Sequence, residues 1–207
     1  MGLADRIQNK SYINMKKLLL FSLAVILGFI AVKAQTTYKL TSAQNMVKGT
    51  SSLHDWRCVV EKQSGSAVIN TEGALEIKSL FVRMVAKSLR SVKENGSYYD
   101  ASMDKNTYKA LNADAFPEIV YTLNSISNVK TTGNTSTLTA TGNLTIAGQT
   151  RAITFPIKAT VNGNTINFTG SVKFKMTTFG IKPPTALLGT IKTGDEVTIV
   201  INTTYSK

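Results

Sequence analysis

Hydrophobic and polar residues alternate with a period of two along much of the chain. The stretch TINFTGSVKFKM (165–176) places its apolar residues and one glycine on a single face: Ile166, Phe168, Gly170, Val172, Phe174 and Met176. The segments 119–123, 138–146, 153–159 and 197–201 repeat this pattern, and 81–87 follows it less regularly. Successive side chains of a β-strand point to opposite faces, so the pattern predicts strands with one apolar face each.

Short turn sequences separate these segments. Thr132-Gly133-Asn134, Ala147-Gly148-Gln149 and Asn162-Gly163-Asn164 combine residue types that favour tight turns. They predict that 152–160 and 165–176 form a hairpin across Asn162-Gly163, and that 136–146 pairs with 151–160 across Gly148. Seven or eight antiparallel strands of this kind predict an all-β sandwich or a closed barrel.

One segment breaks the alternation. Residues 104–114, DKNTYKALNAD, contain good helix formers and end shortly before Phe116-Pro117. Asp104 is a suitable N-cap residue, and proline disfavours helical backbone in the residue before it. We therefore expect one short helix between two strands.

The N-terminal region has the organisation of an export signal. Met15-Lys16-Lys17 precedes an apolar run of 15 residues, Leu18 to Val32, and Val32 and Ala34 are small residues in the −3 and −1 positions of a cleavage site. A membrane-spanning helix needs about 20 apolar residues. We expect residues 1–34 to be an N-terminal extension and signal peptide cleaved after Ala34, 35–207 to be the folded domain, and the protein to be periplasmic or secreted. An uncleaved membrane anchor is the alternative.

Charge and cysteine content narrow the function classes. Residues 35–207 contain 19 lysines and arginines and 11 acidic residues, a net charge of +8, but no run of three basic residues. Dispersed charge and an export signal argue against a nucleic-acid partner, although an encounter with an anionic membrane surface stays open. Cys58 is the only cysteine, so the fold has no internal disulfide.

The stretch SLHDWRCV (52–59) contains the only histidine, tryptophan and cysteine of the chain. If it is a regular strand, His54 and Cys58 lie about 13 Å apart, too far for a nucleophile and its base. One histidine and one cysteine also fall short of a zinc site. We predict no catalytic and no metal site here. Trp56 either anchors the core or stacks on a ligand.

The rest of the chain contains none of the common catalytic signatures. It has no G-x-S-x-G, no phosphate-binding glycine-rich loop and no dinucleotide-binding motif. Large residues alternate with small ones on the apolar faces, as with Leu138 and Gly142. An eight-stranded barrel with such a lining either holds one small apolar ligand or is filled by its own side chains, and periodicity alone does not decide between them.

Several stretches together resemble the YceI-like family of exported bacterial proteins. They are DASMDKNTYKALNADAFPEIVYTL (100–123), ATGNLTIAGQTRAITFPI (140–157), KFKMTTFGIKPP (173–184) and KTGDEVTIVIN (192–202). The second contains the most specific piece, G-x-L-T-I-x-G-x-T-R. The histidine that members commonly have in an Asp-x-His-Leu arrangement is absent, since Asp100 is followed by Ala-Ser-Met103.

The resemblance implies an antiparallel, eight-stranded lipocalin-like barrel that binds a polyisoprenoid or another long-chain amphiphile without catalysing a reaction. We therefore expect a non-enzymatic lipid-binding protein without a cofactor, with a homodimer left open. A structural envelope protein with a solid barrel and an enzyme using Cys58 or His54 are the alternatives. The residues predicted to line the ligand site are apolar and lie on the inferred strands: Trp56, Val82, Met84, Tyr121, Leu138, Phe155, Phe168, Phe174, Met176 and Ile199.

Overall fold

The computed structural model describes residues 35–207, which form one compact unit. Twelve strands and one α-helix make up this unit. The strands are β1 (Thr36–Ala43), β2 (Met46–Ser51), β3 (Trp56–Val60), β4 (Gln63–Asn70), β5 (Glu76–Val85), β6 (Leu89–Ser91), β7 (Glu118–Thr132), β8 (Thr135–Ile146), β9 (Gln149–Asn162), β10 (Thr165–Lys175), β11 (Thr185–Ala186) and β12 (Ile191–Ser206). The helix is α2 (Ala101–Ala110).

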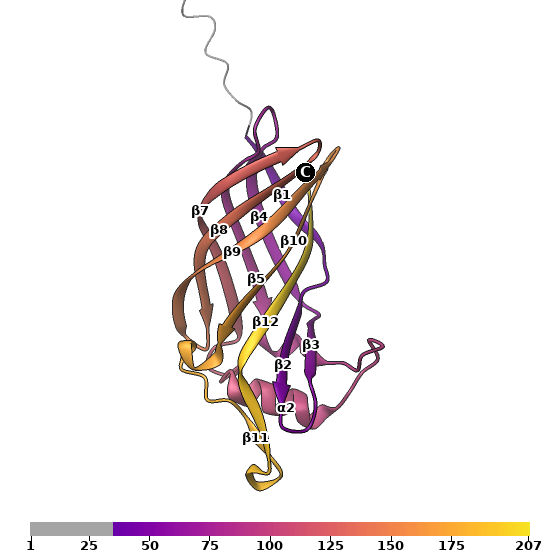
Figure 1. Ribbon diagram of the computed structural model, residues 1–207, viewed down its shortest axis with the longest axis vertical. Helices are drawn as coiled ribbons and strands as arrows, with labels where there is room; N and C mark the ends of the chain where they lie inside the picture. The colour runs from indigo at the N-terminus through magenta and orange to yellow at the C-terminus, as the bar shows by residue number, and fades with distance from the viewer. Residues whose placement is uncertain (1–34) are drawn as a thin grey trace, which may run out of the picture. The chain divides into compact units, whose positions relative to one another are not determined.

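The strands close into an antiparallel barrel with eight strand positions. β7, β8, β9, β10 and β12 each occupy one position. Each of the other three positions is occupied by two consecutive strands joined at a bend: β1 with β2, β3 with β4, and β5 with β6. β1 and β2 both pair with β12, β4 and β3 pair with β1 and β2, and β5 and β6 pair with β4 and β3. β12 is paired with β10 on one side and with β1 and β2 on the other, which closes the barrel (Figure 1). The predicted all-β barrel and the hairpins at Asn162-Gly163 and Gly148 are confirmed.

Two amide side chains lie where the bent pairs change direction. Asn45, between β1 and β2, is buried, and its Nδ2 donates to Oε1 of Gln63 at 2.7 Å. Its Oδ1 accepts from the backbone N–H of Asn202 on β12 at 3.0 Å. Gln63 donates to the carbonyl oxygens of Ala43 and Val60. These bonds satisfy backbone groups that the sheet ladder leaves free at the bend.

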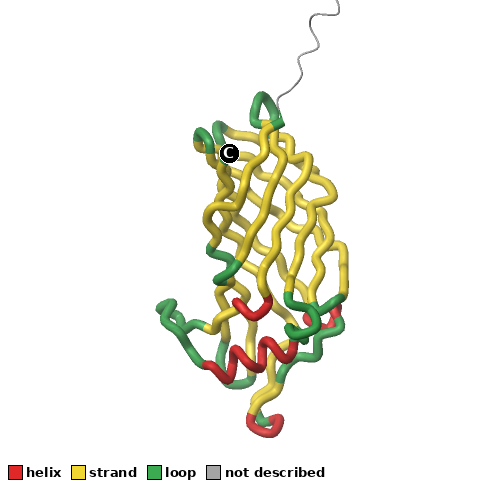
Figure 2. The backbone as a smooth tube through the Cα atoms, turned by 180° about the vertical axis from the view of Figure 1, so that it is seen from behind, coloured by secondary structure: helices red, strands yellow, loops and turns green. Residues whose placement is uncertain are grey.

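The barrel has two different ends. At one end, the turn end, the hairpins β4–β5, β7–β8 and β9–β10 reverse direction. At the other, the helix end, lie α2 and the hairpin formed by β11 and β12 (Figure 2). The chain reaches α2 from β6 through residues 92–100 and leaves it for β7, so the helix lies across the same end where β2 turns into β3.

The helix begins earlier than the sequence predicts. Its N-cap is Asp100, whose carboxylate accepts from the backbone N–H of Met103 at 2.9 Å. Asp104, the predicted cap, lies in the first turn, where its buried carboxylate accepts from the backbone N–H of Ser91 at 2.7 Å. Either aspartate could cap the N-terminus of a helix. The contact of Asp104 with Ser91 on β6 leaves Asp100 as the cap.

The strand predicted across SLHDWRCV is also shorter than expected. β3 begins at Trp56, and residues 52–55 form the turn between β2 and β3. Ser51 stabilises this turn, since its hydroxyl donates to the carbonyl oxygen of His54 at 2.7 Å and accepts from the backbone N–H of Leu53 at 3.2 Å. His54 therefore lies in a turn rather than on a strand face.

Aromatic side chains fill the half of the barrel next to the turn end. Tyr38, Phe168 and Tyr205 are almost completely buried there, and the rings of Phe168 and Tyr205 pack edge to face at 5.6 Å between centroids. Ile69 and Ile166 complete this packing with no exposed surface. Buried side chains in protein interiors are close-packed, and none of these five lines the cavity described below.

The predicted signal peptide, residues 1–34, lies outside the described residues. Within 35–207, no helix is both long and apolar enough to cross a bilayer.

Candidate ligand-binding cavity

A cavity of about 440 Å³ occupies the half of the barrel next to the helix end. Small-molecule sites in proteins commonly have volumes of about 300–1,000 Å³. Strands β2, β3, β5, β6, β7, β8, β10 and β12 form its walls, and α2 covers it from the end of the barrel. Most of the strand residues that line it are apolar, among them Val47, Cys58, Val60, Met84, Leu89, Ile119, Ile146, Phe174, Val197 and Ile199.

Trp56 forms part of the cavity wall in a fixed orientation. Its indole N–H donates to the carbonyl oxygen of Thr50 at 3.0 Å. The ring lies over Gly49 on the neighbouring strand, where an added Cβ atom would lie 2.3 Å from the indole. Glycine at this position allows the ring to lie flat against the sheet, so one face of the indole is free to contact a ligand.

Polar groups surround the opening. The exposed residues that line the cavity come from the β2–β3 turn, from α2 with its preceding loop, and from β11, and the opening lies among them. The Nε2 atom of His54 lies 2.9 Å from the hydroxyl of Tyr99, and its Nδ1 lies 2.7 Å from the carbonyl oxygen of Asp55. Asp100 and Asn106 lie on the same rim. An amphiphile can therefore bury its chain inside and keep its head group among hydrogen-bonding partners.

Cys58 faces the cavity from β3 but has no exposed surface. Burial raises the pKa of its thiol to about 12, and the nearby Asp104 carboxylate acts in the same direction. A thiol is nucleophilic as its thiolate. At neutral pH Cys58 is therefore protonated, which argues against the thiol-enzyme alternative.

Two aromatic residues, Tyr121 and Phe155, do not line the cavity, but Tyr121 follows the cavity-lining Ile119 on the same face of β7, towards the turn end. We call this pair the aromatic floor. Their ring centroids lie 5.7 Å apart, and both residues are buried. The Tyr121 ring occupies the space above Gly142, where an added Cβ atom would lie 2.6 Å from it. Burial raises the pKa of Tyr121 to about 12, and its hydroxyl has no hydrogen-bond partner among residues 35–207.

The structure separates the predicted site residues into two groups. Five of them line the cavity: Trp56, Met84, Phe174, Met176 and Ile199. The other five do not: Val82, Tyr121, Leu138, Phe155 and Phe168. Tyr121 and Phe155 form the floor, and Phe168 and Leu138 are buried in the packed core with Val82 against it. Ligand contact by any of the ten stays a prediction.

Sequence reasoning missed the part of the lining that lies outside the strands. Met103 and Ala110 contribute from α2 and Leu111 from its C-cap position, at a spacing of seven and eight residues that fits one helix face. Ile181, Pro184 and Ala186 contribute from the segment between β10 and β12. The helix spacing was a usable signal, whereas the latter segment has no periodic pattern.

The described residues contain no group of three or more His, Cys, Asp or Glu side chains that could hold a metal ion. His54, the sole histidine, has both ring nitrogens within hydrogen-bond distance of protein oxygen atoms.

Comparisons with known proteins agree with this architecture. The family model of the YceI-like domain matches residues 33–205. No curated protein matches the chain.

Several solved structures share the fold at low sequence identity. BcnA from Burkholderia cenocepacia has a TM-score of 0.59 at 19% identity, over 77% of this chain and 95% of that one. The YCEI protein of Campylobacter jejuni has a TM-score of 0.55 at 19% identity, over 72% and 82%. A polyisoprenoid-binding domain from Saccharophagus degradans has a TM-score of 0.58 at 10% identity, over 82% and 97%. Since the family model spans the whole barrel, the chain belongs to the YceI-like family.

Proposed function

We propose that this protein is exported and holds one long-chain apolar or amphiphilic molecule in the cavity at the helix end of the barrel. The observation on which the proposal rests is the cavity itself, about 440 Å³ with aliphatic walls and a polar rim. Burial of apolar surface contributes about 25 cal/mol per Å², so such walls favour a hydrocarbon chain. The family and the polyisoprenoid-binding neighbour from Saccharophagus degradans support a lipid ligand.

The cavity volume limits the ligand. An engineered cavity of about 150 Å³ binds benzene, which corresponds to about 25 Å³ per non-hydrogen atom. At that density the cavity of about 440 Å³ holds about 18 non-hydrogen atoms. This corresponds to a fatty acid of about 16 carbons or an isoprenoid of about three units. A longer chain would either extend through the opening or have to displace the aromatic floor.

Trp56 provides the test, because it is the only tryptophan and it lines the cavity. Residues 35–207 are titrated with fatty acids that have a brominated chain of 12, 16 or 20 carbons. We expect saturable quenching of the tryptophan fluorescence, with affinity that rises up to about 16 carbons and then levels off. Lipid extraction and mass spectrometry of protein purified from its native host should recover a molecule of this size.

A matched control separates cavity binding from adsorption to the surface. The variant Ile146→Phe keeps Trp56 but places a larger ring in the cavity, so its quenching should weaken at least tenfold. The absence of saturable quenching at every chain length, together with empty protein from the native host, would contradict the proposal.

Export is tested separately. The mature protein from the native host should begin at Gln35, which N-terminal sequencing measures directly. Protein that retains residues 1–34 after isolation would contradict cleavage and would leave a membrane anchor as the explanation of the apolar run.

A further inference from the structure

Two leucines at the helix end have an unusual backbone conformation. Leu187 and Leu188, at the tip of the hairpin between β11 and β12, have φ angles of 47° and 56°. This left-handed region is disfavoured for residues with a Cβ atom and is normally taken by glycine or asparagine. Leu187 is 72% exposed and Leu188 is fully exposed, so the core does not stabilise either side chain. The fold places two large apolar side chains in water at the end of a projecting hairpin.

A third exposed leucine is fixed beside this hairpin. Leu53, in the β2–β3 turn, is 65% exposed. The neighbouring Ser52 is linked to Lys192 by two hydrogen bonds, from its backbone N–H to the Lys192 carbonyl oxygen at 2.9 Å and from the Lys192 N–H to its hydroxyl at 3.1 Å. The turn and the base of the hairpin therefore form one rigid surface. We call this surface, Leu53 with residues 182–192, the leucine finger.

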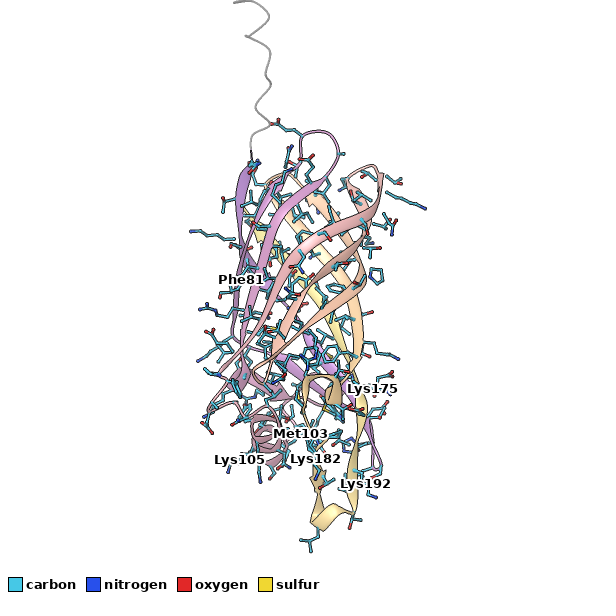
Figure 3. All side chains as sticks on the ribbon, turned by 90° about the vertical axis from the view of Figure 1, so that its left-hand side faces the viewer. Phe81, Met103, Lys105, Lys175, Lys182 and Lys192 are labelled. Carbon is cyan, nitrogen blue, oxygen red and sulfur yellow. The ribbon has the colours of Figure 1, made fainter. Side chains whose placement is uncertain are left out.

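The leucine finger is also basic. Residues 182–192, KPPTALLGTIK, contain two lysines and no acidic residue. Lys182 and Lys192 are exposed, and neither forms a salt bridge with another residue of the described part of the chain. Figure 3 places both lysines at the helix end of the barrel, where Lys105 of α2 also lies.

We infer that the leucine finger docks on an anionic lipid bilayer. Exposed leucines insert at the boundary between head groups and acyl chains, and flanking lysines are attracted to anionic head groups. Leu53, Thr185 and Ala186 belong to this surface and also line the cavity. Docking therefore brings the cavity opening to the membrane surface, where a lipid can pass between bilayer and barrel without crossing bulk water.

Vesicle flotation tests the inference with the empty protein. Residues 35–207 are used because they contain every strand of the closed barrel and its core. We expect the protein to float with vesicles of phosphatidylglycerol and phosphatidylcholine, and to bind less as salt concentration rises. The double variant Leu187→Ser/Leu188→Ser should bind at least tenfold more weakly.

Charge and position are tested with matched variants. Lys182→Glu/Lys192→Glu should weaken binding to anionic vesicles by about fivefold or more for each lysine. The controls Val129→Ser and Lys130→Glu change exposed residues on β7 at the turn end and should leave flotation unchanged. Leu187 and Leu188 do not line the cavity, so their double variant should keep the Trp56 quenching by fatty acids.

Three outcomes would overturn the inference. They are an original protein that does not float with anionic vesicles, finger variants that float as well as it does, and control variants that lose binding equally. If the finger instead joins two copies of the chain, sedimentation without vesicles would show a dimer that the leucine variant abolishes, with no flotation. Because flotation needs no bound ligand, its failure and a failure of the proposed lipid binding are separate results.

Discussion

The two halves of the barrel are built from the same alternating strands, yet one is solid and the other is hollow. In the half at the turn end, Tyr38, Phe168 and Tyr205 on the neighbouring strands β1, β10 and β12 are almost completely buried, and the rings of Phe168 and Tyr205 pack edge to face. In the half at the helix end, the facing positions are mostly aliphatic, such as Val47, Val197 and Ile199, and a cavity of about 440 Å³ remains. The volume of the inward side chains, not the number of strands, decides whether a barrel of this size has room for a ligand.

The comparison also separates two roles for inward residues. In the solid half they stabilise the fold, and in the hollow half they provide a binding surface whose packing is completed by a ligand. Changes in the solid half should therefore alter the free energy of unfolding, whereas changes in the hollow half should mainly alter affinity.

Removal of an aromatic ring should give the largest effect. Phe168→Ala leaves a hole in close-packed surroundings and should lower the free energy of unfolding by about 3–5 kcal/mol. Phe174→Ala enlarges a space that is already empty and should cost less, because the Phe174 ring is only partly buried beside the cavity. Chemical denaturation of both variants measures the difference, and equal losses would remove the distinction between the halves.

Adding volume should have opposite consequences in the two halves. Ile166→Phe overfills the solid half, where Ile166 has no exposed surface, and should cost about 1–3 kcal/mol. Ile146→Phe fills part of the cavity and should change stability by less than about 1 kcal/mol while it lowers ligand affinity at least tenfold. Denaturation and Trp56 quenching on the same two proteins test this. A destabilised Ile146→Phe with unchanged affinity would contradict it.

A change in the aromatic floor should have a smaller effect on the free energy of unfolding, and should raise it rather than lower it. The buried Tyr121 hydroxyl has no hydrogen-bond partner among the described residues. Tyr121→Phe removes this unsatisfied group and should raise the free energy of unfolding by about 1 kcal/mol. A lower stability in this variant would indicate that the hydroxyl has a water or ligand partner.

The same tyrosine predicts a dependence on alkaline pH. An unfolded tyrosine ionises near pH 10, whereas burial raises the pKa of Tyr121 to about 12 in the folded protein. Above about pH 10 the unfolded state loses its proton first, so stability falls as pH rises and reaches its full loss only beyond about pH 12. Burial also raises the pKa of Tyr205, which adds to the fall. Urea denaturation from pH 8 to 11 should show a shallower decline for Tyr121→Phe than for the original protein.

Thiol labelling of the native protein should show the smallest effect, because we expect no reaction of Cys58 at all in the folded state. Cys58 lies on β3 with no exposed surface, and its pKa is raised to about 12. We expect iodoacetamide to modify it at pH 8 only after denaturation. Rapid modification of the native protein would indicate that the hollow half opens readily.

The alternation predicted antiparallel strands and the family resemblance implied the barrel, but neither predicted its division into two halves. Alternation and turn residues predicted the strands and the hairpin at Asn162-Gly163, because these signals are local. Phe168 and Phe174 share one alternating face, yet one is in the solid core and the other lines the cavity. Which large residue meets which small one depends on strand register, as where Tyr121 fills the space above Gly142.

The predicted boundaries of the helix and of the strand at SLHDWRCV were wrong for a related reason. Asp100 and Asp104 are both suitable helix caps, and the contact of Asp104 with β6 selects the former. His54 and Trp56 fit one strand pattern, and the bonds made by Ser51 turn the chain between them. Such choices depend on partners that are distant in sequence or on side chains that compete with the ladder.

The bend at Asn45 and Gln63 has a consequence for how such a barrel can be redesigned. The register of a strand normally spreads along its full length, so one inserted residue reverses every side chain beyond it. Here hydrogen bonds from the Asn45 side chain to Gln63 and from the Asn202 backbone N–H to Asn45 fix the bend between β1 and β2, so a change of register on one side can end there. The cavity walls can therefore be redesigned for a larger ligand while the aromatic half at the turn end keeps its strand register and supplies the stability.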